Sequence, residues 1–125
     1  MWVWDQSAGA LSRDGVEVAK GYSGRDWGKN NPDAEAAQGI GPIPAGDYNI
    51  VELYNSANVG PNALRLQPID ATANDTHDAT GRSAFRIHGD SIRAPGTASY
   101  GCIILRSVIR LAIWDSGDRL LRVVE

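Results

Sequence analysis

The chain has 125 residues, 42% of them hydrophobic, and a formal net charge of −3. This length and apolar content predict one domain with one core, and we assign residues 1–125 to it. The lack of a basic surplus argues against nucleic-acid binding. No apolar run approaches the roughly 20 residues that span a bilayer, so no membrane partner is expected. The first residues lack the basic and apolar regions of a Sec signal peptide.

The N-terminal residues predict short strands joined by tight turns. Residues 2–4 form an apolar segment typical of a first strand. Residues 10–13 and 16–19 flank Asp14 and Gly15, a pair that tolerates the positive φ of a type I′ turn. We therefore expect a β-hairpin over residues 10–19.

Residues 25–41 are polar and irregular, which predicts a long loop with one helical turn over residues 33–38. A loop of this length in a small domain is often functional. A rigid turn rich in proline and glycine follows it. Further strands are expected over residues 47–54, 63–68 and 84–88. The residues of the first of these strands that we expect near the core are Tyr48, Ile50 and Val51.

The last third of the chain has helical periodicity. Its apolar stripe consists of Leu105, Val108, Ile109, Ala112 and Ile113. Ser107 is the expected N-cap, and Gly117 is suited to the left-handed cap that ends a helix. Residues 119–124 predict a last strand. The predicted fold is mainly β and mostly antiparallel, with one helix in the last third of the chain.

The only cysteine, Cys102, lies fourteen positions after His88, one of two histidines. A cysteine thiolate is a nucleophile, and a nearby imidazole can take the thiol proton. Gly101 removes a side chain next to the sulfur, and the amides of Gly101 and Cys102 could hold an oxyanion. The carbonyl of Gly89 could orient the imidazole. A small buried hydrophobe is the alternative role for Cys102.

The sequence resembles the L,D-transpeptidase catalytic domain, and more specifically the small antibacterial effectors of that type exported by type VI secretion. The resemblance covers nearly the whole chain. The segments that carry it are Gly21-Tyr22-Ser23-Gly24, Asn30-Asn31-Pro32, Gly41-Pro42-Ile43-Pro44, Phe85-Arg86-Ile87-His88-Gly89-Asp90 and residues 99–105, Ser-Tyr-Gly-Cys-Ile-Ile-Leu. It implies a β-sandwich or barrel-like fold.

The resemblance implies a cysteine enzyme that acts on peptidoglycan stem peptides. Cys102 would attack the carbonyl of the third residue and release the terminal D-Ala. Water would complete an L,D-carboxypeptidase reaction, and another amine an L,D-transpeptidase reaction. His88 would be base and then acid, and no cofactor is implied. Export without a Sec signal, action in the periplasm of a target cell and inhibition by a cognate immunity protein are implied by the effector group.

The chain departs from the broad family next to the sulfur. Tyr100 replaces a histidine, and Ile104 replaces an arginine. The residues that could take over oxyanion or substrate binding are Tyr100, Ser99, Asp90, Arg93 and Arg106. Asp90 is also a plausible turn former.

Three other hypotheses remain open at this point. A degenerate wall-binding or protein-binding module and a cysteine endopeptidase are the alternative functions. Residues 75–78 (Asp-Thr-His-Asp) hold potential metal ligands, but too few for a zinc site, so a solvated loop is preferred and no metal is expected.

Overall fold

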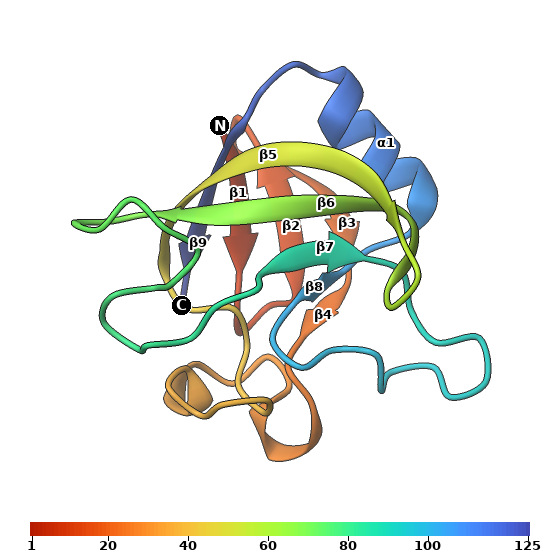
Figure 1. The fold of residues 1–125 in the computed structure, drawn as a ribbon. Helices are drawn as coiled ribbons and strands as arrows, with labels where there is room; N and C mark the ends of the chain where they lie inside the picture. The colour runs from red at the N-terminus through yellow and green to blue at the C-terminus, as the bar shows by residue number, and fades with distance from the viewer.

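The computed structural model describes residues 1–125, and the prediction of a mainly β fold with one late helix is confirmed. The strands are β1 (Trp2–Asp5), β2 (Ala10–Arg13), β3 (Val16–Lys20), β4 (Tyr22–Ser23), β5 (Gly46–Ser56), β6 (Gly60–Ile69), β7 (Arg86–His88), β8 (Ile103–Ile104) and β9 (Leu120–Val124). The helix α1 spans Ser107–Asp115 (Figure 1). No helix is both long and apolar enough to cross a membrane.

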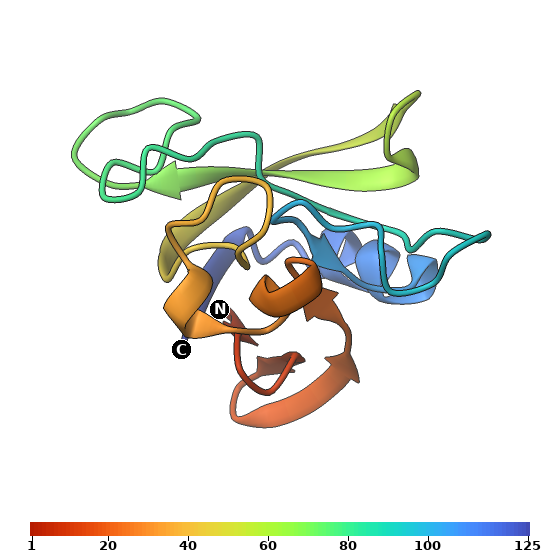
Figure 2. The ribbon, with the colours of Figure 1, turned by 90° about the horizontal axis from the view of Figure 1, so that it is seen from below.

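All nine strands belong to one mixed sheet in the order β3-β2-β1-β9-β5-β6-β7-β8-β4. A flat sheet of nine strands would separate its edges by about 38 Å at a spacing of about 4.8 Å. The two edge strands, β3 and β4, are nevertheless joined by Gly21 alone. The sheet must therefore curl until its edges meet, and Figure 2 shows β5 and β6 on the opposite side of the molecule from β1–β3.

Most pairings are antiparallel, as predicted, and two are parallel: β1 with β9 and β7 with β8. The β2–β3 hairpin turns at Asp14 and Gly15, whose φ values of 52° and 79° are those expected of a type I′ turn. In β5 the expectation for Val51 is wrong, because side chains alternate and Val51 points away from the face that buries Tyr48 and Ile50; the register shifts between Ile50 and Glu52. Val51 is the extra residue of that bulge and is exposed.

The core lies inside the curled sheet. Tyr48 and Ile50 are in it, as expected, and so are Trp2 and Trp4. The other large members are Leu11, Ile43, Leu64, Leu66, Phe85, Ile87, Ile103, Leu105, Ile113, Leu121 and Val123. Ile87 of β7 and Ile103 of β8 are both in this core, which fixes the orientation of their neighbours along each strand.

Two details of the helix prediction are wrong. The N-cap is Arg106, and Ser107 is the first helical residue. Val108 and Ala112 are exposed, because the buried face turns toward Ile113 and Arg110 instead. The guanidinium of Arg110 donates to the carbonyl oxygens of residues 61, 62 and 105, so a charged residue occupies a position that apolar periodicity cannot find. Gly117 has φ +75°, as its predicted cap role requires.

The two long polar segments are more ordered than predicted. Residues 25–41 hold two 3₁₀ turns, Asp26–Gly28 and Pro32–Ala34, in place of one helical turn over residues 33–38. The expectation of a solvated loop over residues 75–78 holds for Asp75 and Asp78, which are exposed, and is wrong for His77. This side chain is buried, its Nε2–H donates to the Ala45 carbonyl at 3.1 Å, and its Nδ1 accepts from the Thr80 hydroxyl at 3.0 Å. Both ring nitrogens therefore have structural roles.

Candidate active site

The pairing of β7 with β8 brings the cysteine and the histidine to one face of the sheet. Ile87 is paired with Ile103, and both point into the core. Because side chains alternate along a strand, His88 and Cys102 point to the other face. They occupy diagonal positions of neighbouring parallel strands. At ideal strand spacing, the Cα atoms of two residues placed in this way lie about 8 Å apart.

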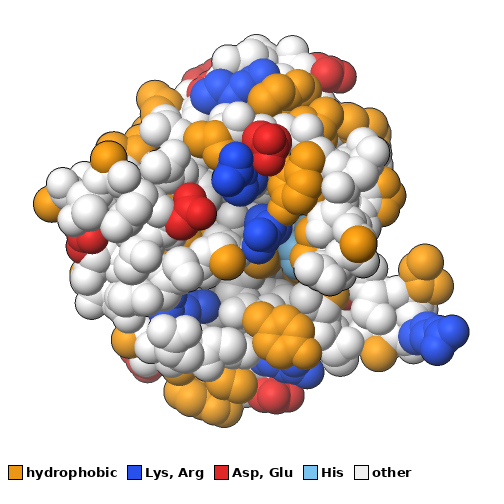
Figure 3. All heavy atoms as spheres, viewed as in Figure 1, with side chains coloured by type: hydrophobic (Ala, Val, Ile, Leu, Met, Phe, Trp, Pro, Cys, Tyr) orange, Lys and Arg blue, Asp and Glu red, His pale blue; other side chains and the backbone are white.

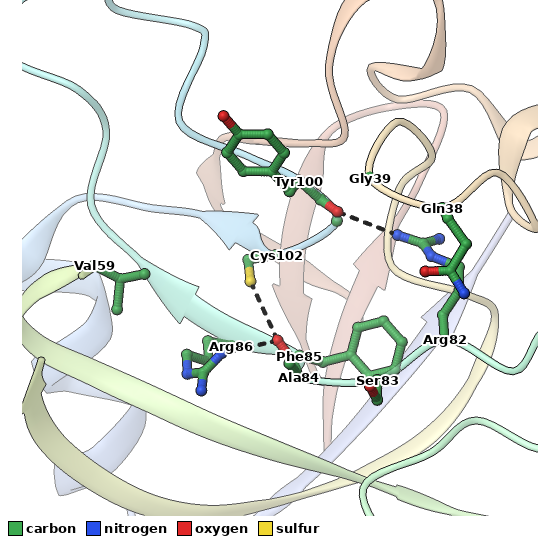
Figure 4. Close-up of a pocket in the computed structure, with 11 residues that line it drawn as sticks. Gln38, Gly39, Val59, Arg82, Ser83, Ala84, Phe85, Arg86, Tyr100 and Cys102 are labelled. Atoms are coloured by element: carbon green, nitrogen blue, oxygen red, sulfur yellow. Dashed lines mark hydrogen bonds between the residues drawn. The ribbon is translucent and has the colours of Figure 1, made fainter.

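Cys102 is half-buried and lines a cavity of about 250 Å³. Its thiol donates to the carbonyl oxygen of Ala84, with 3.7 Å between Sγ and O (Figure 4). Ala84 has φ +63°, a conformation uncommon for a residue with a Cβ, and the strand predicted over 84–88 begins only at Arg86. The thiol is thus held at a cavity wall by a backbone oxygen.

His88 is buried, and its Nδ1 lies 2.8 Å from the carbonyl oxygen of Gly89. A carbonyl only accepts hydrogen bonds, so Nδ1 carries the proton and the neutral ring is bare at Nε2. Burial lowers the pKa of His88 below 6.5, and the charges of Arg110 and Arg86 lower it further against the effect of Gly89. The imidazole is therefore neutral at neutral pH, with Nε2 available as a base.

The thiol of Cys102 is also uncharged at rest. Burial raises its pKa, while the backbone N–H of Arg86 and the charges of Arg86 and Arg82 act in the opposite direction. A raised thiol pKa next to a lowered imidazole pKa favours a neutral pair over a thiolate–imidazolium pair. The thiol hydrogen-bonds to Ala84 and the imidazole to Gly89, and no hydrogen bond joins Sγ to the His88 ring, so a proton transfer between them requires the two side chains to come closer.

The turn before Cys102 is held by Ser99, which is fully buried. Its hydroxyl oxygen accepts from the amides of Gly24 at 2.8 Å and Gly101 at 3.1 Å, and donates to the Cys102 carbonyl at 2.6 Å. The Gly101 amide, expected at an oxyanion site, is therefore engaged by Ser99. The Cys102 amide has no protein acceptor.

Gly101 is required where it lies. Its φ is +127°, and a Cβ there would stand 2.1 Å from Nη2 of Arg82. The Arg82 side chain is almost fully buried, and it donates to the carbonyl oxygens of Glu35, Gly41, Pro42 and Tyr100. Arg82 thus ties the end of the 25–41 loop to the turn that carries the cysteine.

The remaining candidates are spread around the site. Tyr100 is exposed and its ring lies against Arg25, with 4.4 Å from the guanidinium carbon to the ring centroid. The Asp90 carboxylate accepts from the Tyr22 hydroxyl and from the amides of residues 91 and 96, which makes it a turn former. Arg93 is exposed on a second cavity, and Arg106 borders neither that cavity nor the one at Cys102.

This second cavity, of about 650 Å³, is the one that His88 and Gly89 line. Val59 and Tyr100 line both cavities, so the two are adjacent. Figure 3 shows a hollow on this side of the molecule, with basic and hydrophobic side chains around it and a histidine visible inside. The cysteine and histidine therefore face neighbouring parts of one concave region.

Two arginines near the thiol were not predicted. Arg86 is two residues before His88, so strand alternation places it on the same face, and that spacing could have identified it. Arg82 gives no comparable signal, because its four carbonyl partners come from segments far apart in sequence.

Comparison with curated protein sequences gives no match. The family model of the Tlde1 domain matches residues 17–124, from β3 to the end of β9, and includes every residue of the site described above. The chain therefore belongs to the Tlde1 domain family, a family of type VI secretion L,D-transpeptidase-like effectors.

Proposed function

We propose that this protein is a cysteine-dependent acyl-transfer enzyme that removes or exchanges the terminal D-Ala of peptidoglycan stem peptides. Family membership supports the substrate class and the type of reaction. The observation that carries the assignment to residues is the β7–β8 register, which directs Cys102 and His88 to the same face of the sheet. Cys102 is the nucleophile, and His88 is the general base and acid.

In the first half-reaction, the sulfur of Cys102 forms a bond to the carbonyl carbon of the third stem residue. The thiol proton moves to Nε2 of His88, and the carbonyl electron pair moves to the oxygen. The C–N bond to D-Ala then breaks, the departing nitrogen takes the proton from Nε2, and a thioester remains. The Gly89 carbonyl keeps the proton on Nδ1 throughout.

In the second half-reaction, His88 takes a proton from the incoming nucleophile, which attacks the thioester carbon and expels the Cys102 sulfur. Water gives the L,D-carboxypeptidase product, and an amine gives the L,D-transpeptidase product. Every bond change is carried by side chains of this chain and the substrate. The Cys102 amide, which has no protein acceptor, stabilises the oxyanion, and the Gly101 amide joins it only if Ser99 releases it.

The family is one of secreted effectors, and peptidoglycan lies outside the cytoplasmic membrane. We therefore propose delivery into the periplasm of a target cell without a Sec signal. A protein that kills by this route would also need a cognate immunity protein in the producing cell.

The test is incubation of the purified protein with disaccharide-tetrapeptide muropeptides, followed by mass analysis of the products. We expect loss of D-Ala, or its exchange when a D-amino acid is supplied. Cys102→Ala and His88→Gln should abolish the reaction. His77→Gln is the matched control, because His77 lies away from both cavities, and it should retain activity while folded.

Other outcomes would favour the alternative functions. Cleavage within a crosslinked dimer, with no loss of terminal D-Ala, would identify an endopeptidase. Binding to purified cell walls without any change in the muropeptides would identify a binding module and contradict the proposal.

A further inference from the structure

Arg86 lies next to the nucleophile in the strand register and lines the same cavity. It precedes Ile87, the partner of Ile103, just as Cys102 precedes Ile103, so the two residues are neighbours across β7 and β8. The carbonyl oxygen of Ala84 accepts from the Cys102 thiol and, at 3.1 Å, from Nη1 of Arg86 (Figure 4). The guanidinium and the thiol are therefore held at the same backbone oxygen.

Arg86 also keeps a donor unused. Its Nε donates to the Tyr54 hydroxyl and its Nη1 to Ala84, whereas Nη2 has no protein acceptor. None of the salt bridges of the molecule involves Arg86. Arg82 is the only other cation that lines the Cys102 cavity, and both of its terminal nitrogens donate to backbone carbonyls. An anion that enters this cavity would meet Arg86.

The proposed substrate carries such an anion at a fixed distance from the bond that breaks. In a peptide that loses one C-terminal residue, the terminal carboxylate carbon is three bonds from the attacked carbonyl carbon. With standard bond lengths, this separation is at most about 3.8 Å. A cation that recognises the carboxylate must therefore lie beside the nucleophile, as Arg86 does. Arg93 lines the other cavity, and Arg106 borders neither.

We propose that Arg86 binds the terminal carboxylate of the stem peptide and so makes the enzyme specific for a chain end. This inference rests on the proposed function. It gives Arg86 the role for which the sequence suggested Arg93 or Arg106. The guanidinium is suited to the task, because its unused Nη2 can donate a charge-assisted hydrogen bond to a carboxylate.

The experiment compares two substrates that differ only at the chain end: a tetrapeptide with a free terminal carboxylate and the same tetrapeptide with a terminal carboxamide. We expect the wild-type protein to prefer the free acid in kcat/KM. Arg86→Met should lower kcat/KM for the acid by roughly 10- to 100-fold, the usual effect of losing a hydrogen bond to a charged group, and should change the amide little. Arg86→Lys should restore part of the preference.

The ratio of the two substrates is the decisive quantity. Loss of Arg86 also changes the charge around Cys102 and His88, but that effect acts equally on both substrates and cancels in the ratio. Arg122→Met removes an exposed arginine that lines neither cavity, and it should leave the ratio unchanged. If Arg86→Met keeps the wild-type ratio, or if Arg93→Met abolishes it, the proposal is wrong.

A binding measurement separates this proposal from the proposed function. In a Cys102→Ala background, calorimetry with the same two peptides should show tighter binding of the acid, and Arg86→Met should remove the difference. If the wild-type protein shows no turnover but the acid still binds more tightly in an Arg86-dependent way, the proposed enzymatic function is wrong and the carboxylate site is supported. Normal turnover with no acid preference would contradict the carboxylate site alone.

Discussion

The hydroxyl of Ser99 donates a 2.6 Å hydrogen bond to the carbonyl oxygen of Cys102, and the hydroxyl oxygen itself accepts from the amides of Gly24 and Gly101. One buried side chain therefore fixes the backbone on both sides of the sulfur and joins it to the β4 end. The sequence suggested Ser99 as a substrate-binding residue. In the structure its hydrogen bonds are all internal, which makes it a positioning residue.

Ser99→Ala should lower the free energy of unfolding by at least about 2 kcal/mol, because each buried polar group left without a partner costs about 1–3 kcal/mol. Urea denaturation measures this change. Ser107→Ala is the control, since Ser107 is exposed and makes no side-chain hydrogen bond, and its effect should stay within about 0.5 kcal/mol. Equal effects of the two variants would show that Ser99 does not hold the turn.

Gly101→Ala should be among the most damaging small substitutions in the chain. The residue has φ +127°, a backbone conformation that residues with a side chain rarely adopt and that costs them about 1–3 kcal/mol. The new Cβ would also displace Arg82 from its carbonyl partners. Gly15→Ala is a matched control, because Gly15 also has positive φ, no atom lies within 4 Å of the added Cβ, and the residue lines neither cavity.

We expect Gly15→Ala to cost about 1–2 kcal/mol and to preserve turnover. Gly101→Ala should cost more and also lower kcat at temperatures where it remains folded. A Gly101→Ala protein as stable and active as Gly15→Ala would mean that Arg82 can move without consequence for the site.

The pH profile should report a neutral catalytic pair. Burial lowers the pKa of His88 below its ordinary 6.5, so activity should fall only as pH drops below about 6.5 and the base becomes protonated. Burial raises the pKa of Cys102, so alkylation of the free enzyme by iodoacetamide should accelerate with pH well above neutrality. An alkylation rate that is already at its plateau at pH 6 would indicate a thiolate–imidazolium pair instead.

The sequence was informative where local rules decide the outcome. Asp14 and Gly15 set the hairpin through their φ angles, and strand alternation placed Tyr48 and Ile50 in the core. Val51 was misplaced, because alternation after Tyr48 and Ile50 directs it outward. The bulge then reverses the pattern, so that Leu53 and not Glu52 packs against the core, and no local pattern marks that bulge. Arg110 was missed because long-range carbonyl partners satisfy a buried charge at an apolar position of the helix.

In the candidate site, too, local sequence predicts some features and long-range contacts determine the others. Motifs could select Cys102, His88 and Gly89, because each lies in a short segment with a chemical pattern. Two other features depend on where distant loops meet: the hydrogen bond from the Gly101 amide to Ser99, and the hydrogen bonds from the terminal nitrogens of Arg82 to backbone carbonyls. That information is absent from the local sequence.

Trp4 tests whether the N-terminal strands belong to the domain. The family model begins at residue 17, after β1 and β2, yet β1 lies between β2 and β9 and pairs with β9 in parallel. Trp4 is fully buried in the core, whereas Trp27 is 63% exposed. Trp4→Ala should therefore cost about 3–5 kcal/mol of unfolding free energy, and Trp27→Ala far less.

Trp4→Phe separates packing from hydrogen bonding. The indole N–H of Trp4 is buried without an acceptor, so a phenyl ring should keep much of the apolar contact, lose no hydrogen bond and cost clearly less than Trp4→Ala. Urea denaturation of the three variants gives the comparison. If Trp4→Ala destabilises the protein no more than Trp27→Ala, β1 does not contribute to cooperative folding, and the folded unit is the segment 17–124 alone. A large loss would mean that the cooperative unit extends beyond the family boundary, because the parallel β1–β9 pair closes the core beneath the last strand.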